Sequence, residues 1–250
     1  WVAQRGNASL RTVLIVDDAP AQQYLAPEFD MFRELFAAHG LTALVADARE
    51  LQWHGGSLHH PDLPPGTAVD LVYNRLTDFY LQDDTHQALR MAHEAGAVVL
   101  TPHPRTHALY ADKRNLIALS DNDLLAQWGV SEADRALLSA VVPTTQRVST
   151  DKADALWANR RGLFFKPAAG FGARAAYRGD KLTRRVWGDI LAGDYVAQAL
   201  VPPSERLVRV QDDTQRLKLD LRAYTYRGEV QLLAARTWTG QTTNFRTEGG

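Results

Sequence analysis

The sequence predicts an α/β protein in two parts, a parallel sheet wrapped by helices followed by an α+β region built on antiparallel sheets. Over the first third of the chain, short apolar runs alternate with amphipathic helical segments, which is typical of β-α-β units. Beyond Gly162 the expected strands follow one another with glycine turns between them, which favours antiparallel pairing. We therefore expect two domains, 1–110 and 111–250.

The first part begins with Thr12–Val16, a β-branched and apolar run that ends at Asp17-Asp18 and predicts a buried strand. A helix is expected at 27–39, where phenylalanines recur at helical spacing and Gly40 provides a C-terminal stop. The remaining expected elements are strands at 41–46, 70–73 and 97–100 and a helix at 85–94. Gly55-Gly56 and the prolines that follow predict a loop.

In the second part we expect helical segments first and strands afterwards. Helices are expected at 108–119 and 121–128, with Ser131 as the N-cap of a third. Strands are expected at 163–165, 175–177 and 195–201, and a hairpin is expected from 217–226 to 229–235. The hairpin should turn at Arg227-Gly228, because glycine readily adopts the backbone angles of tight turns.

Composition excludes several classes of function. Lys plus Arg number 28 and Asp plus Glu 29, so the chain cannot coat nucleic acid or a membrane through bulk charge. With no cysteine, disulfides, thiolate catalysis and cysteine-ligated zinc are excluded. The histidines lack metal-ligand spacing, and the basic run at Lys181, Arg184 and Arg185 reads as a solvated face. We expect a cytoplasmic protein that has lost sequence at both ends, since it begins at Trp1 and stops directly after a motif.

The segment that starts at Lys166 has the composition of a phosphate-binding loop. Lys166 ends an expected strand, and Gly170 and Gly172 follow before the chain turns back. Glycines let backbone N–H groups approach phosphate oxygens, and the lysine adds a positive charge. The order differs from that of a P-loop, and the third glycine of a dinucleotide fingerprint is missing. A tight hairpin with an exposed lysine is the alternative interpretation.

A second group of charged residues lies on the expected hairpin. Asp220 and Arg222 point to the same face of their strand because side chains alternate, and Arg236 on the returning strand can join them. The polar tail from Thr243 to Gly250 includes Asn244. Taken one by one, these residues also fit an ordinary surface ion pair followed by a loop.

The order of these motifs resembles that of the ATP-grasp superfamily: a lysine with its glycine-rich loop, an Asp-x-Arg strand, a second Arg strand and Asn-x-x-x-x-Gly-Gly. The resemblance is to carboxylate–amine ligases such as glutathione synthetases and ribosomal-protein glutamate ligases. It implies ATP and Mg²⁺ as cofactors and an acyl-phosphate intermediate. Lys113 and Lys166 would bind phosphates under the Gly170–Gly172 loop, and Gln198 to Val201 would meet the adenine. Arg222 and Arg236 would act catalytically on the transferred phosphate, while Asp220 and Asn244 would complete the nucleotide site.

The first part resembles the pre-ATP-grasp region of glutathionylspermidine-synthase-like and circularly permuted ATP-grasp proteins, through Tyr73-Asn74-Arg75, His93–Gly96 and Asp112–Asn115. It implies a role for Arg75 as a clamp on a substrate carboxylate. The substrates would be a small-molecule or peptide carboxylate and an amine. The family's Glu-x-Asn metal motif is not found, which leaves Asn244 as the one candidate metal ligand and predicts C-terminal truncation, permutation or inactivity.

Three alternatives stay open from the sequence. The chain could be a nucleotide-binding module without ligase activity, or an ATP-grasp kinase that phosphorylates a small molecule. A Rossmann-type sugar- or dinucleotide-binding protein is disfavoured, because Asp17–Pro20 stands where a glycine-rich turn would follow the first strand. The sequence does not define the oligomeric state.

Overall fold

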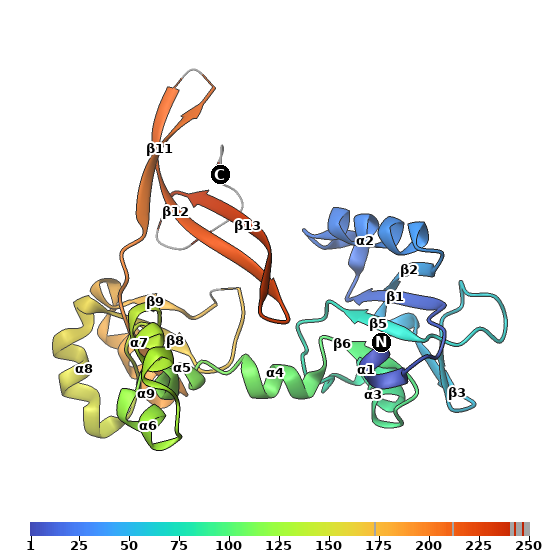
Figure 1. The fold of residues 1–250 in the computed structure, drawn as a ribbon, viewed down its shortest axis with the longest axis horizontal. Helices are drawn as coiled ribbons and strands as arrows, with labels where there is room; N and C mark the ends of the chain where they lie inside the picture. The colour runs from blue at the N-terminus through green and yellow to red at the C-terminus, as the bar shows by residue number, and fades with distance from the viewer. Residues whose placement is uncertain (173, 212, 241–242, 244–246, 248–250) are drawn as a thin grey trace. The chain divides into compact units, whose positions relative to one another are not determined.

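The computed structural model describes residues 1–172, 174–211, 213–240, 243 and 247. The chain divides into two compact units, Trp1–Ala111 and Asp112–Gly250, and each is described separately. The predicted fold class is confirmed: a parallel sheet with helices comes first, and antiparallel sheets follow (Figure 1). Within the described residues, no helix is both long and apolar enough to span a membrane.

The first unit is a parallel sheet with helices on both faces. Its helices are α1 Val2–Arg5, η1 Pro20–Gln22, α2 Ala26–Ala38, η2 Ala48–Glu50, η3 Asp84–His86, α3 Gln87–Glu94 and α4 Pro104–Tyr110, and its strands are β1 Thr12–Asp17, β2 Thr42–Asp47, β3 Gln52–His54, β4 Ser57–His59, β5 Leu71–Asn74 and β6 Val99–Thr101. The sheet order is β2-β1-β5-β6, and all three pairings are parallel. The four strands and two helices expected here are all present.

Strand β1 explains why helices cover both faces of this sheet. All six of its residues are buried, so neither face is free to meet water. Val13 packs in a cluster with Phe36 of α2, and Leu14 in a separate cluster with Leu89 of α3. Successive side chains point to opposite faces, so α2 and α3 cover opposite faces. Figure 1 shows the same arrangement.

The loop expected after β2 is partly wrong. Gln52–His54 and Ser57–His59 pair as a short antiparallel hairpin, with Gly55-Gly56 as its turn. Both glycines have positive φ, of 58° and 73°. Those angles are the ones that two-residue hairpin turns require, so the glycine pair marks a hairpin here and the loop proper begins after it.

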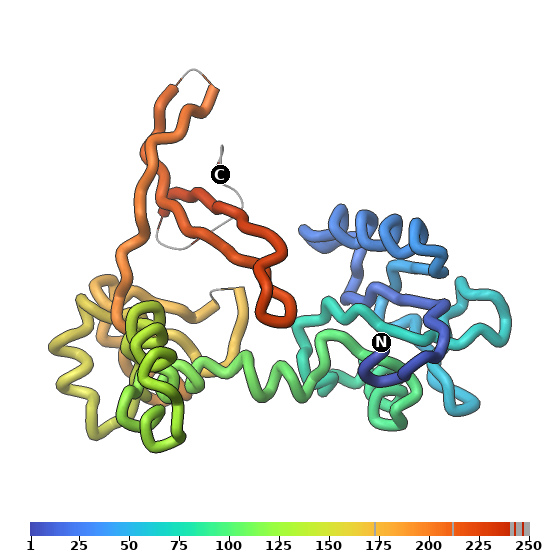
Figure 2. The backbone as a smooth tube through the Cα atoms, viewed as in Figure 1, coloured from blue at the N-terminus to red at the C-terminus, as the bar shows by residue number. Residues whose placement is uncertain are grey.

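The second unit contains a helical region and two antiparallel sheets. Its helices are α5 Asn115–Leu119, α6 Asn122–Gln127, α7 Glu132–Val141, η4 Thr150–Lys152, α8 Ala153–Asn159, η5 Arg160–Gly162, η6 Gly179–Lys181 and α9 Arg184–Ala192, and its strands are β7 Thr145–Arg147, β8 Leu163–Pro167, β9 Tyr177–Arg178, β10 Tyr195–Ala199, β11 Ser204–Val210, β12 Asp213–Tyr226 and β13 Glu229–Trp238. One sheet has the order β7-β10-β8-β9 and the other β11-β12-β13. The chain passes from the first sheet to the second through residues 200–203 (Figure 2).

The single helix expected at 108–119 is wrong. The chain forms α4 and α5 with a break between them, because the Asp112 carboxylate accepts a hydrogen bond of 2.8 Å from the backbone N–H of Arg114. In the break, the N–H of Lys113 donates to the carbonyl of Ala168 at 2.9 Å instead of to a helical carbonyl. The break therefore fixes Lys113 beside the chain that follows β8.

Helices α8 and α9 were not expected from the sequence. The hydroxyl of Thr183 caps α9 by accepting from the N–H of Val186, and Trp187 and Ile190 are buried one turn apart. They pack with Phe165 of β8 in the core of this unit. Lys181, Arg184 and Arg185 are exposed, as expected of a solvated face. These charges made the apolar face of α9, with Trp187 and Ile190, hard to recognise in the sequence.

Candidate functional site

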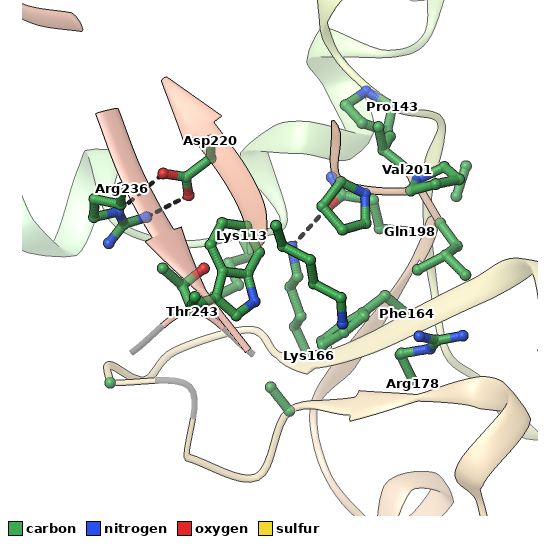
Figure 3. Close-up of a pocket in the computed structure, with 18 of the residues that line it drawn as sticks. Lys113, Pro143, Phe164, Lys166, Arg178, Gln198, Val201, Asp220, Arg236 and Thr243 are labelled. Atoms are coloured by element: carbon green, nitrogen blue, oxygen red, sulfur yellow. Dashed lines mark hydrogen bonds and ion pairs between the residues drawn. The ribbon is translucent and has the colours of Figure 1, made fainter. Parts of the chain in front are cut away.

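The described residues of the second unit form a cavity of about 1070 Å³ between its two sheets. One wall comes from β8 and the chain that follows it, and the opposite wall comes from β12 and β13. The predicted site residues in its lining are Lys113, Lys166, Gly170, Gly172, Gln198, Val201, Asp220, Arg222 and Arg236. Figure 3 shows several of them directed toward a common space. Positions spread over more than a hundred residues thus meet in one place.

Lys166 is held by a chain of hydrogen bonds whose direction can be assigned. Its ammonium donates to Oε1 of Gln198 at 2.7 Å, and Nε2 of Gln198 donates to Oγ1 of Thr145 at 3.0 Å. The Thr145 hydroxyl donates in turn to the carbonyl of Pro143 at 2.9 Å. A carbonyl only accepts, so Pro143 fixes the hydroxyl, the hydroxyl fixes the amide, and the amide presents its oxygen to Lys166.

Gln198 therefore supplies a neutral acceptor where a carboxylate would have formed an ion pair. Burial first, and then the nearby Lys113, lower the pKa of Lys166. Both effects disfavour a charged ammonium, and an anionic ligand in the cavity would relieve both. The geometry leaves the charge of Lys166 available to such a ligand.

Lys113 approaches the same cavity from the break between α4 and α5. Its ammonium donates to the carbonyl of Gly170 at 3.1 Å, and burial lowers its pKa while Asp112 opposes that change. Its backbone is fixed by the bond to Ala168. Lys113 thus contacts the glycine-rich segment through both its backbone and its side chain.

The glycines of that segment are required by its backbone. Gly170 has φ of 144° and Gly172 has φ of 59°, which are angles that residues with a Cβ rarely adopt. A Cβ on Gly170 would also come within 3.3 Å of Cγ of Pro167. These residues allow the backbone to line the cavity without side chains in the way.

The opposite wall carries a two-pronged ion pair. Nε and Nη2 of Arg236 donate to the two carboxylate oxygens of Asp220 at 3.0 and 2.6 Å. The two residues lie opposite each other in the register of β12 and β13, and the hydrogen bonds from Arg236 lower the pKa of Asp220. Arg222 lies two residues further along β12 and contacts the hydroxyl of Tyr224 at 3.4 Å. The expected grouping of Asp220, Arg222 and Arg236 on one face is therefore observed.

Positive charge dominates the described lining. Arg174, Arg178 and Lys218 also line the cavity, and Asp220 is its one carboxylate among the described residues. Arg178 is paired with Asp180, and Lys218 donates to the carbonyl of Gly240. The arrangement suits a polyanion such as a nucleoside triphosphate.

The described residues do not fit a magnesium site. Mg²⁺ is held in proteins mainly by carboxylates, and the carboxylate of Asp220 is already engaged by Arg236. No group of three or more potential acidic or imidazole ligands occurs among the described residues. Asn244, the candidate metal ligand, lies outside the described residues.

Arg75 lies in the first unit, just beyond the end of β5. Its guanidinium pairs with Glu28 at 3.1 Å and donates to the hydroxyl of Tyr73 at 3.0 Å. It also stacks over the ring of Phe29, with 5.7 Å from Cζ to the ring centroid. The guanidinium therefore already has an anionic partner within the first unit.

Several residues that line the cavity or support its lining were not predicted from the sequence. Lys218 could have been predicted, because the alternation that placed Asp220 and Arg222 on one face also places Lys218 there. Thr145 and Trp238 gave no signal. Thr145 acts through a contact 53 residues away, and Trp238 ends a strand whose final residues were not expected to be extended.

No family profile matches the sequence, and no curated protein matches it. Among solved structures, the D-cycloserine synthetase DcsG is similar at 18% identity and a TM-score of 0.43, over 75% of this chain and 58% of that one. The ATP-grasp ligase PsnB, complexed with a minimal precursor, is similar at 17% and 0.41, over 92% and 76%. The macrocyclase MdnC, bound with precursor peptide MdnA from Microcystis aeruginosa, is similar at 11% and 0.47, over 92% and 79%. The chain thus spans less than two thirds of DcsG, and similarities of this size leave the function to be argued from the site.

Proposed function

We propose that the second unit binds ATP in this cavity and that the protein is an ATP-grasp ligase, joining a carboxylate to an amine. One observation carries the proposal. Lys113 and Lys166 come from distant parts of the chain to one cavity, and neither forms an ion pair with a described carboxylate. Two partly desolvated ammonium groups beside a glycine-rich segment favour a phosphate chain as the ligand.

In the proposed reaction, an oxygen of the substrate carboxylate attacks the γ-phosphorus of ATP, the bond to the β-phosphate oxygen breaks, and ADP leaves. The amine then attacks the acyl carbon, and inorganic phosphate leaves with the electron pair of the broken C–O bond and takes up the proton that the amine loses. The protein contributes position and charge. Lys113 and Lys166 neutralise phosphate oxygens, and Arg222 and Arg236 stabilise the charge that develops on the transferred group.

Asp220 has a positioning role in this proposal. The paired hydrogen bonds fix the plane of the Arg236 guanidinium and so its orientation in the cavity wall. The substrate in this proposal is a small-molecule or peptide carboxylate. Arg75, expected from the sequence as its clamp, is paired with Glu28 in the first unit.

The charge balance of the cavity favours one competing function, a nucleotide-binding module without ligase activity. A single engaged carboxylate in the described lining fits nucleotide binding better than it fits metal-assisted phosphoryl transfer. Phosphate release separates the two. A ligase releases phosphate only when ATP, a carboxylate and an amine are all present, whereas a binding module releases none.

Calorimetric titration with ATP, ADP and NAD in the presence of Mg²⁺ tests the nucleotide site. We expect ATP to bind more tightly than NAD, and Lys166→Ala to weaken ATP binding by about tenfold or more, since it removes a charge-assisted contact. Lys181→Ala is the matched control, because Lys181 is exposed and lies outside the lining. Equal affinities for the parent and Lys166→Ala would reject the assignment.

A further inference from the structure

Trp238, at the end of β13, has a buried hydrogen-bond donor without an acceptor. Among the described residues, its Nε1 is the one buried side-chain nitrogen or oxygen with no hydrogen-bond partner. The residue is 5% exposed. Buried polar groups in folded proteins are nearly always paired, because leaving one unpaired costs its hydration free energy. An orphan of this kind calls for an explanation.

The position of Trp238 in the cavity wall explains the unpaired donor. Trp238 belongs to the lining of the cavity, and so does Lys218, its direct partner across β12 and β13. Residues opposite each other in an antiparallel pair share a face of the sheet. Asp220 and Arg236 form the next pair on that face. The indole therefore belongs to the wall that carries the charged groups of the site.

The register also places Trp238 along the length of the cavity. Ser204, the first residue of β11, pairs with Leu219, and Glu205 pairs with Lys218, so Lys218 and Trp238 lie where β11 begins, just after the segment 200–203. Arg222 lies further along β12, toward the hairpin turn at Arg227-Gly228. In the proposed complex, the base meets the segment from Gln198 to Val201 and the phosphates meet the two lysines and Arg222. The part of the nucleotide between them is the sugar.

We propose that the indole N–H of Trp238 donates a hydrogen bond to a ribose hydroxyl oxygen of the bound nucleotide. This inference rests on the proposed function and deepens it, by naming the residue that recognises the sugar. A hydroxyl oxygen accepts from the indole and still has its own proton to donate elsewhere. The site therefore discriminates a ribonucleotide from the deoxynucleotide that lacks this hydroxyl.

The first test uses the parent protein, with no variant. Calorimetric affinities are compared for ATP, 2′-deoxy-ATP and 3′-deoxy-ATP. We expect one deoxy analogue to bind about tenfold more weakly than ATP, the effect of one lost hydrogen bond whose buried donor then stays unpaired. If both analogues bind as tightly as ATP, the proposal is overturned whatever any variant does.

The second test is Trp238→Phe, which keeps an aromatic ring and removes the N–H. We expect it to lose about tenfold in affinity for ATP and to lose nothing further with the discriminating analogue. Trp128→Phe is the matched control, because Trp128 is 64% exposed and lies outside the lining. In the absence of nucleotide, Trp238→Phe removes an unpaired donor, which favours stability, and also indole volume, which opposes it, so we expect only a small change in melting temperature.

Two results would overturn the inference at this stage. An unchanged affinity for ATP in Trp238→Phe would show that the N–H contacts no part of the nucleotide. A lowered melting temperature without nucleotide, combined with an equal loss for all three nucleotides, would show a structural role instead. If the parent binds no ATP at all, the nucleotide site itself fails, and that outcome differs from a parent that binds ATP without regard to the sugar.

Discussion

The hydrogen-bond chain that ends at Lys166 should be a large local contribution to the stability of the second unit. Gln198→Met removes both of its bonds, the charge-assisted one at 2.7 Å and the neutral one at 3.0 Å, while a side chain of similar volume fills the site. A hydrogen bond to a charged group contributes about 1.5–3 kcal/mol and a neutral one about 0.5–1.5 kcal/mol. Because Lys166 borders the cavity and can recruit water, we expect a loss of about 2–3 kcal/mol.

Urea denaturation followed by tryptophan fluorescence provides the assay, since Trp157 and Trp187 report on the core of this unit. Gln146→Met, on the neighbouring strand β7, is the matched control: Gln146 is half-buried and faces Ala197 in the register. We expect it to change the free energy of unfolding by less than about 0.5 kcal/mol. Equal losses for the two variants, or a loss below about 0.5 kcal/mol for Gln198→Met, would refute the argument.

Three further predictions concern pH and packing. Arg236 lowers the pKa of Asp220, so the pair stabilises the fold above the unfolded pKa of about 3.9, and this stabilisation is lost as pH falls through the folded pKa. Below about pH 5, the urea midpoint of Asp220→Asn should therefore depend less on pH than that of the parent, and an equal dependence in the two proteins would contradict this. His86 is 2% exposed and bonds Asp18 at 2.9 Å and Asp78 at 2.8 Å; burial lowers its pKa, but the two carboxylates outweigh it and raise the value overall. The stabilisation that the charged His86 gives the fold is therefore complete below about pH 6.5 and is lost as pH rises through the folded pKa. The urea midpoint of the first unit should fall over that pH range in the parent and stay constant in His86→Gln. Gly179→Ala would place a Cβ 1.7 Å from the carbonyl oxygen of Arg160 and should lower the free energy of unfolding by about 2–3 kcal/mol. Gly188→Ala, with open space inside α9, should raise it by about 0.5–1 kcal/mol, and the reverse order of the two variants would contradict close packing of Gly179 against Arg160.

The elements that the sequence predicted are those whose signal is local. Thr12–Val16 is uniformly apolar and β-branched, and it became the buried strand β1. The turn at Arg227-Gly228 forms as expected, with positive φ at both residues. Side-chain alternation correctly placed Asp220 and Arg222 on one face.

What the sequence could not predict depends on contacts between distant segments. The break at Asp112–Arg114 requires the carbonyl of Ala168 as an acceptor, and no property of the helix sequence reveals that bond. Trp187 and Ile190 can be recognised as core residues only in the folded protein, where Phe165 packs against them. The link from Thr145 to Gln198 depends on the pairing of β7 with β10, which had no independent signal.

The most direct test of the central claim labels the protein with an acyl-phosphate derivative of ATP, which acylates lysines that lie against bound phosphates. Peptide mass spectrometry would then locate the label, with and without excess ATP. We expect Lys113 and Lys166 to be acylated and ATP to protect both, while the exposed Lys152 and Lys181 react weakly and without protection. Labelling that ATP does not reduce, or that falls on Lys152 and Lys181 and spares the two lining lysines, would contradict this expectation.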